Sequence, residues 1–244
     1  MECRNMEVIK DTIIKNLQKY KEETNCKGVV IGISGGKDST VVAMLAKLVW
    51  GNNVIGIMLP NGYQSDLCAA QYVVRSLNLQ HMQINIDSIV EEINNKVFSF
   101  SKAAKTNIPP RVRMTMLYAM AQTMGYRVMG TGNLSEIYIG WTTKWGDGAY
   151  DINPIGHLTC TEVVELGKLL IKEFDLDVSF ITKTPEDGLT GISDEDNFGF
   201  TYKELDDYIL NGNYPSQKVK NKIDAMHKAS EHKRLACGNI LSIY

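Results

Sequence analysis

The segment GISGGKDST, residues 32–40, joins an apolar run to a helical pattern and contains the residue types that bind phosphate. Gly35 and Gly36 would let the backbone approach an anion closely, and Ser34 and Ser39 add hydroxyl donors. The first amides of the helix that follows have no helical partner, so they would also face a bound anion. The segment therefore predicts a phosphate-binding loop.

This loop is not a Walker A motif, which requires glycine, four residues, and then Gly-Lys-Ser/Thr. With Gly36 and Lys37 aligned to that motif, Ile31 stands at the first glycine and Asp38 at the hydroxyl position. A carboxylate beside phosphate is repulsive unless a cation lies between them, and Mg²⁺ binds carboxylates together with phosphate oxygens. Asp38 is thus either a magnesium ligand or only an acidic residue in the first turn of a helix.

The elements around this loop alternate between short apolar runs and helical patterns. The expected strands are residues 28–34, 53–59, 81–87 and 126–132. The expected helices are 6–21, 38–49, 65–77, 111–124, 161–174, 202–210 and 215–235. This alternation predicts an α/β fold with a doubly wound, mainly parallel sheet and helices on both faces. Ligands of such sheets bind beyond the carboxyl ends of the strands, where the 32–40 loop would lie.

The composition is that of one ordinary α/β domain, which we expect to span residues 1–244. Of the 244 residues, 44% are hydrophobic and 22% charged, and the formal net charge of −2 gives no electrostatic case for a nucleic-acid partner. No window approaches the roughly 18 apolar residues of a membrane span. The five cysteines are scattered and form no CxxC pair, which argues against a disulfide framework or a zinc site and favours a cytoplasmic location.

Two long segments lack a helical or strand period. Residues 140–156 are rich in glycine and aromatic residues, which predicts an ordered functional loop. Residues 182–201 are expected to form a mobile loop that closes over a ligand, because a stretch of this length without periodicity is usually a lid or a binding loop.

Five separated segments carry a resemblance to a known family. SGGKDS resembles the pyrophosphate-binding loop of the N-type ATP pyrophosphatases. PPRVRM (109–114), GTGNLSE (130–136), TKWGDGAYDINPI (143–155) and EHKR (231–234) are similar to segments of the NAD synthetases, in the same order. The resemblance implies an adenine-nucleotide alpha-hydrolase-like, Rossmann-like fold. It also implies ATP-dependent amidation of deamido-NAD with ammonia, through an acyl-adenylate, with release of AMP and pyrophosphate. A homodimer is implied as well, and the chain has no room for a glutaminase domain.

The same resemblance assigns roles to residues. Asp38 and Glu136 are the expected catalytic carboxylates and Mg²⁺ ligands. Trp141 and Trp145 are candidates for stacking on a flat ring, and Glu195 for a substrate contact. The expected ATP-binding residues are Gly32, Ile33, Ser34, Gly35, Gly36, Lys37, Asp38, Ser39 and Thr131. The expected deamido-NAD-binding residues are Arg111, Lys144, Asp151, His232 and Lys233.

One position departs from the family's pattern, and two other functions stay open. The family usually carries a phosphate-contacting lysine where this chain has Cys160, and Lys183 is the expected substitute for its charge. A sulfate-nucleotide reductase with Cys237 as its cysteine is one alternative function. A non-catalytic nucleotide-binding module is the other, although it leaves Glu136, Lys144 and Asp151 without a role.

Overall fold

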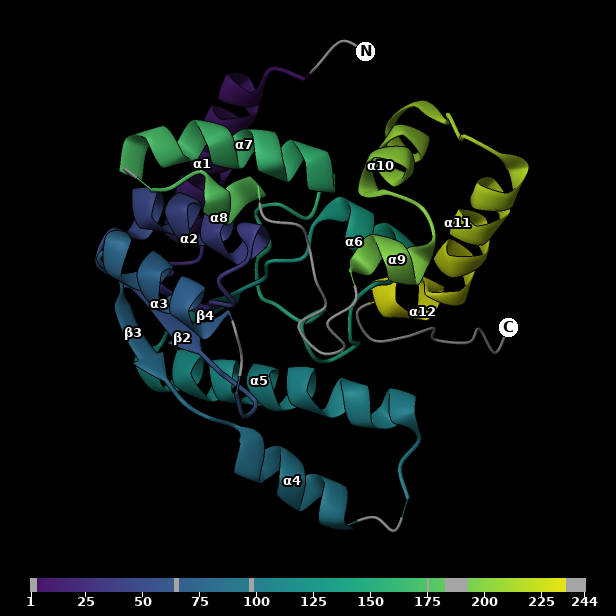
Figure 1. The fold of residues 1–244 in the computed structure, drawn as a ribbon. Helices are drawn as coiled ribbons and strands as arrows, with labels where there is room; N and C mark the ends of the chain where they lie inside the picture. Colours follow the sequence, from purple (N-terminus) through teal and green to yellow (C-terminus); the bar gives the residue numbers. More distant parts are fainter. Residues whose placement is uncertain (1–3, 64–65, 97–98, 175, 183–192, 236–244) are drawn as a thin grey trace, which may run out of the picture.

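A parallel sheet forms the centre of the computed structural model, which describes residues 4–63, 66–96, 99–174, 176–182 and 193–235 (Figure 1). In these residues the sheet has four strands in the order β3-β2-β1-β4. They are β1 (Val29–Gly32), β2 (Val54–Met58), β3 (Gln80–Gln83) and β4 (Arg127–Met129). Val30 of β1 pairs with Ile55 of β2 on one side and with Val128 of β4 on the other.

Helices cover both faces of this sheet, as Figure 1 shows. One face carries α1 (Met6–Glu23), α2 (Lys37–Trp50), α3 (Leu67–Ser76), α7 (Cys160–Phe174) and α8 (Ser179–Thr182). The other face carries α4 (Asp87–Lys96) and α5 (Lys102–Met124). The α/β doubly wound fold expected from the sequence is therefore confirmed.

A third group of helices packs beside these layers around its own apolar cluster. It contains α6 (Leu134–Ile139), α9 (Asp194–Phe198), α10 (Tyr202–Asn211), α11 (Gln217–Ala229) and α12 (Glu231–Arg234). Phe198, Tyr202, Leu205 and Ile223 are its buried centre. Because Cys160 belongs to the same cluster, the start of α7 joins this group to the sheet layers.

The strands of the sheet centre form because their residues are apolar without interruption. Val29, Val30 and Ile31 are fully buried, as expected for a parallel strand that is covered on both faces. Beyond β3 the chain stays extended, and the amides of Ile84 and Ile86 still donate to the carbonyls of residues 58 and 60. The strand expected at 81–87 therefore lies at 80–83, and α4 begins at residue 87.

The helix expected at 111–124 is longer than its sequence suggested. It begins at Lys102, is capped by Ser101, and runs through Pro109 and Pro110. The expectation that it starts after Pro110 was wrong, because a proline inside a helix removes a donor without always ending the helix. In the 182–201 segment, a short helix, α9, occupies residues 194–198, and residues 183–192 lie outside the described part.

No helix in the described part of the chain is long and apolar enough to cross a membrane.

Candidate active site

The loop between β1 and α2 has the geometry of an anion site. Gly35 has a φ of +84°, and a Cβ there would lie 2.6 Å from the amide nitrogen of Ala70, so only glycine fits. Gly36 is the N-cap of α2 and brings no side-chain cap, which leaves the first amides of the helix available to a ligand. The hydroxyls of Ser34 and Ser39 lie 3.1 Å apart, and the Ser34 hydroxyl also accepts the amide of Gly36 at 3.2 Å.

The carboxylates of Asp38 and Glu136 meet at this loop. Asn133 connects them, because its side-chain amide donates to Asp38 Oδ1 at 3.1 Å and its backbone amide donates to Glu136 Oε2 at 3.0 Å. Burial raises the pKa of Glu136 well above its ordinary value, and the charge of Asp38 raises it further. The two carboxylates are therefore close enough to repel each other.

A cavity of about 820 Å³ opens beside these carboxylates. Its lining includes Gly32, Ile33 and Ser34 of the loop, together with Thr131 and Glu136. Charged and aromatic side chains also line it, namely Lys102, Arg113, Trp141, Asp147, Asp194 and Lys233. The volume and the mixture of apolar walls with a few polar groups are typical of a ligand site.

Of the five residues expected to bind deamido-NAD, Lys233 lines the cavity. Its ammonium donates to the carbonyls of Gly140 and Thr142, each at 2.7 Å. Burial lowers the pKa of Lys233, while the nearby charge of Asp147 raises it. This lysine therefore brings a fixed, partly desolvated charge to the wall of the cavity.

Arg111, Lys144 and His232 lie together outside that wall and form what we call the basic rim. Arg111 Nε donates to the carbonyl of Lys144 at 3.2 Å, and Lys144 Nζ donates to the carbonyl of His232 at 2.6 Å. Beside them, Trp145 is 58% exposed and has a φ of +65°, a backbone conformation that costs free energy for a residue with a side chain. These four residues come from three segments far apart in the sequence.

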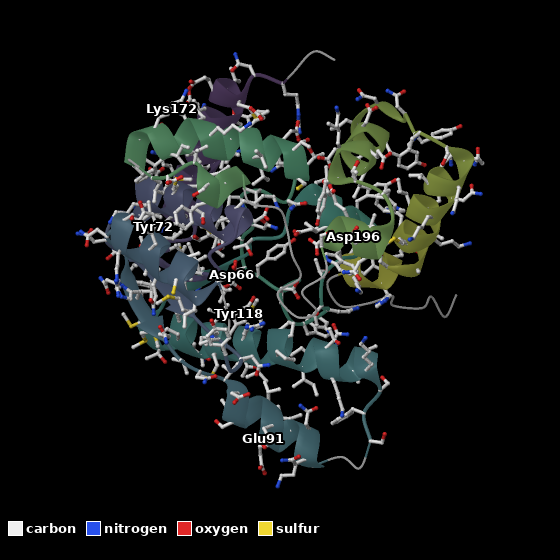
Figure 2. All side chains as sticks on the ribbon, in the orientation of Figure 1. Asp66, Tyr72, Glu91, Tyr118, Lys172 and Asp196 are labelled. Atoms are coloured by element: carbon white, nitrogen blue, oxygen red, sulfur yellow. The ribbon has the colours of Figure 1, made fainter. Side chains whose placement is uncertain are left out.

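Asp151 lies apart from the basic rim, alongside β4. One of its carboxylate oxygens accepts the amide of Val128 at 2.8 Å, and the other accepts the hydroxyl of Tyr118 at 3.4 Å. Tyr118, labelled in Figure 2, lies on α5. Because residue 152 forms a parallel bridge with residue 129, Asp151 fixes the 140–156 loop to the edge of the sheet.

The wall opposite α5 is fixed by Asp194, a residue that the sequence analysis did not single out. Trp141 Nε1 donates to Asp194 Oδ1 at 3.1 Å, and the hydroxyl of Tyr202 donates to Oδ2 at 2.9 Å. Phe198 packs edge-on against Trp141, with 4.7 Å between the ring centroids. Glu195, the residue expected to contact substrate, accepts the backbone amide of Tyr202 at 2.8 Å.

Asp147 and Arg113 were also missed as cavity residues. Both fall inside segments that the sequence analysis quoted, WGDG and PPRVRM, but neither segment says which side chain faces inward. The carboxylate of Asp147 accepts the backbone amide of Thr143 at 2.8 Å, and burial raises its pKa. Arg113 Nε donates to the carbonyl of Leu59 at 2.9 Å, which holds its guanidinium against the end of β2.

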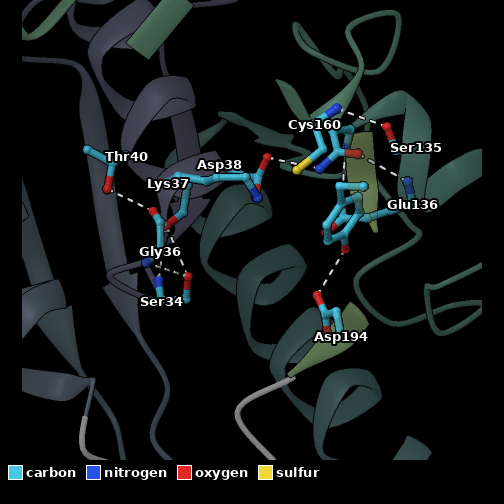
Figure 3. Close-up of polar contacts among 12 residues, drawn as sticks. Ser34, Gly36, Lys37, Asp38, Thr40, Ser135, Glu136, Cys160 and Asp194 are labelled. Carbon is cyan, nitrogen blue, oxygen red and sulfur yellow. Dashed lines mark hydrogen bonds and ion pairs between the residues drawn. The ribbon is translucent and has the colours of Figure 1, made fainter. Parts of the chain in front are cut away.

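A second, buried hydrogen-bond network begins at Ser135, the residue next to Glu136. Asp206 of α10 accepts the hydroxyl of Ser135 through one oxygen and the backbone amide of Thr161, at 2.8 Å, through the other. The Ser135 oxygen in turn accepts the backbone amide of Cys160 at 2.9 Å (Figure 3). The network joins α6, α7 and α10 directly beside the carboxylate pair.

The cation nearest to Cys160 in the described residues comes from the loop itself. Lys37 is buried, its ammonium lies 2.7 Å from Asp38 Oδ2, and its charge interacts with the Cys160 side chain. Lys183 and Cys237, to which the sequence analysis gave possible roles, lie outside the described residues.

Comparison with known proteins decides which family this architecture represents. The family model for NAD synthase matches residues 9–237. This chain belongs to the NAD synthase family. It is 38% identical over 237 residues to the NH(3)-dependent NAD(+) synthetase of Carboxydothermus hydrogenoformans, covering 94% of this chain and 96% of that one.

Two solved structures are also similar over nearly the whole chain. The NMN synthetase of Francisella tularensis is 35% identical, with a TM-score of 0.89 and coverage of 98% of this chain and 99% of that one. The NH3-dependent NAD synthetase of Campylobacter jejuni is 26% identical, with a TM-score of 0.80 and coverage of 98% and 100%. Membership of the NAD synthase family confirms the resemblance drawn from the five segments.

Proposed function

We propose that this chain is a ligase that converts deamido-NAD to NAD with ATP and ammonia, releasing AMP and pyrophosphate. The relatives from Carboxydothermus and Campylobacter are named as ammonia-dependent NAD synthetases. The observation that carries the proposal is that Asn133 connects Asp38 and Glu136 at the glycine loop between β1 and α2, beside a cavity whose lining includes Lys102, Arg113 and Lys233.

In the first half-reaction, an oxygen of the nicotinate carboxylate attacks the α-phosphorus of ATP. The bond from that phosphorus to the bridging oxygen breaks, and pyrophosphate leaves. The first amides of α2 and the hydroxyls of Ser34 and Ser39 would hold this leaving group. Stabilising charge at a preorganised loop lowers the barrier without costly reorganisation.

The carboxylate pair fits a magnesium ion, because both members are oxygen ligands and their mutual repulsion is relieved by a cation. No group of three or more His, Cys, Asp or Glu side chains suited to a metal occurs in the described residues, so phosphate oxygens would complete the coordination. When bound, Mg²⁺ would neutralise the charge that develops on the phosphates. Asn133 orients both carboxylates for this role, because it donates one hydrogen bond to each.

In the second half-reaction, ammonia attacks the acyl carbon of the adenylate, AMP leaves, and one proton is released. The acyl-adenylate must be kept from water, which would hydrolyse it. Trp141 supplies an apolar part of the cavity wall, and Phe198 packs against it from the buried cluster. Lys233 is placed to pair with the negative charge of the nucleotide substrate.

The direct test incubates the purified chain with ATP, Mg²⁺, deamido-NAD and ammonium, and measures NAD by an enzymatic cycling assay. We expect NAD to form with ammonium but not when glutamine replaces it. Asp38→Asn should abolish NAD and AMP formation, whereas Asp11→Asn, at an exposed position of α1, should not change either. Strong turnover with glutamine by the chain alone, or full activity of Asp38→Asn, would contradict the proposal.

A second candidate function is amidation of the mononucleotide, because the similar Francisella structure is an NMN synthetase. A mononucleotide lacks the adenylyl half that we expect the basic rim to contact. The assay therefore compares kcat/KM for deamido-NAD with that for nicotinate mononucleotide. If the dinucleotide is the substrate, Arg111→Ala should lower its kcat/KM several-fold and leave the mononucleotide value unchanged.

We infer further that the chain works as a homodimer of one-domain subunits spanning residues 1–244, in the cytoplasm. Ile89 and Ile93 are partly exposed one turn apart on α4, which offers an apolar strip for a partner copy. Cys26, Cys68 and Cys160 are free thiols, in keeping with a reducing compartment. Light scattering at assay concentration tests the dimer, and a fully active monomer would refute it.

A further inference from the structure

The Lys37 side chain lies inside the acidic part of the site. It is 5% exposed, its Nζ lies 2.7 Å from Asp38 Oδ2, and the ring centroid of Tyr202 lies 5.7 Å away (Figure 3). A lysine this deeply buried is costly unless its charge is compensated. Here the compensation comes from the carboxylates that the proposed function assigns to magnesium.

Both carboxylate oxygens of Asp38 already have a donor. The side-chain amide of Asn133 donates to Oδ1 at 3.1 Å, and the ammonium of Lys37 donates to Oδ2. A metal ion that binds Asp38 must therefore share the carboxylate with these two donors. The Asn133 amide is neutral, so the Lys37 ammonium is the group that opposes a second cation by its charge.

The charge of Lys37 is kept by its surroundings. Burial lowers its pKa, but the carboxylate of Asp38, which lies 2.7 Å from Nζ, raises it by more, and this ion pair keeps the group an ammonium. The two carboxylates and this ammonium leave the site with at most one net negative charge. That is too little to hold a divalent cation firmly without further anionic ligands.

We propose that the Lys37 ammonium occupies the cation position on Asp38 in the free enzyme, so that a free divalent ion binds weakly and the metal enters together with the triphosphate. This inference rests on the proposed metal site at Asp38 and Glu136. The phosphates bring the missing negative charge, and the ring of Tyr202, whose centroid lies 5.7 Å from the Lys37 Nζ, already gives the ammonium a second favourable neighbour. Lys37 is thus a positioning residue that makes metal binding depend on nucleotide.

The experiment titrates the chain with Mn²⁺ in the absence of any nucleotide and measures free Mn²⁺ by electron paramagnetic resonance. The variants are Lys37→Met, Lys37→Arg and Lys47→Met. The last removes a lysine of the same helix whose ammonium donates to Asn52 and Asn78, away from the carboxylates. We expect Lys37→Met to bind Mn²⁺ about tenfold or more tightly than wild type, because an opposing charge has gone. Lys37→Arg and Lys47→Met should bind it as weakly as wild type.

Each variant is first checked for native circular dichroism, because an unfolded chain also binds Mn²⁺ through its exposed carboxylates. In a folded variant, a gain in affinity separates this role from a merely structural one. Adding Glu136→Gln to Lys37→Met should remove the gain and so locate the ion. If folded Lys37→Met, or Lys37→Gln where the methionine variant fails to fold, binds Mn²⁺ no more tightly than wild type, the inference is wrong. The titration contains no substrate, so failure of the NAD assay would refute the proposed function and leave this result standing.

Discussion

Replacement of Asp206 by alanine should destabilise the fold far more than its distance from the cavity suggests. The side chain is 3% exposed and accepts two hydrogen bonds, from the Ser135 hydroxyl and from the Thr161 amide. Alanine would leave both donors buried without this acceptor, at about 1–3 kcal/mol each. Burial raises the pKa of Asp206, so the carboxylate itself carries a desolvation cost that partly offsets the loss. We therefore expect the free energy of unfolding to fall by about 2–4 kcal/mol.

Urea denaturation followed by circular dichroism measures this change, with the slope of the free energy against urea concentration expected to stay constant. Asp207→Ala is the matched control, because the neighbouring aspartate makes only exposed contacts, with Asn211 and Asn213. It should cost less than about 1 kcal/mol. Asp206→Asn should fall between the two, since an amide accepts through one oxygen only. A change below about 0.5 kcal/mol for Asp206→Ala, or an equal loss for Asp207→Ala, would refute the reasoning.

Three further predictions concern charge and backbone geometry. Burial raises the pKa of Glu162, but the Arg4 guanidinium lowers it by more, to below its ordinary 4.5. The ionised Glu162 therefore stabilises the fold above that pH, and this stabilisation is lost as the pH falls below it. Glu162→Gln should therefore lower the free energy of unfolding by about 1–2 kcal/mol at pH 7 and by progressively less toward pH 3. An equal loss at both pH values in urea denaturation would contradict this. Gly35→Ala should weaken ATP binding about tenfold or more in calorimetry, because its φ of +84° and the nearby backbone leave no room for a Cβ, and normal ATP affinity would show that the loop adapts. Cys160→Lys should lower the melting temperature by at least about 5 °C by placing a second ammonium beside Lys37. Adding Lys37→Met should restore most of the lost melting temperature. A Cys160→Lys variant as stable as wild type would show that the two ammonium groups do not repel each other there.

The sequence predicted the elements whose pattern is local. β1 and β2 were recognised because their residues are apolar without interruption, and the loop before α2 because its glycines and serines are consecutive. The long α5 was predicted only from its second half, since Pro109 and Pro110 look like a helix start when read alone. What kept the helix continuous was packing on the sheet, through Val112 and Leu117, which no local pattern reveals.

In the candidate site, too, some residues could be predicted from the sequence and others only from the fold. Asp38 was predicted from its place in the loop, and Glu136 from the family resemblance. The bond between Trp141 and Asp194 joins residues 53 positions apart, so neither segment alone could indicate it. The place of Lys37 beside Cys160 depends on how α7 packs across the start of α2, which is tertiary structure.

The two prolines of α5 bear on how the substrate choice of this enzyme could evolve. Neither Pro109 nor Pro110 has an amide proton, so the carbonyls of residues 105 and 106 receive no helical hydrogen bond from them. The first turns of α5, which bring Lys102, Thr106 and Asn107 to the cavity, are thus joined to the rest of the helix by fewer bonds than an unbroken helix provides. The second half of α5 carries the apolar contacts with the sheet. Natural variation can therefore reshape one wall of the cavity without disturbing the core, which separates the evolution of substrate choice from that of stability.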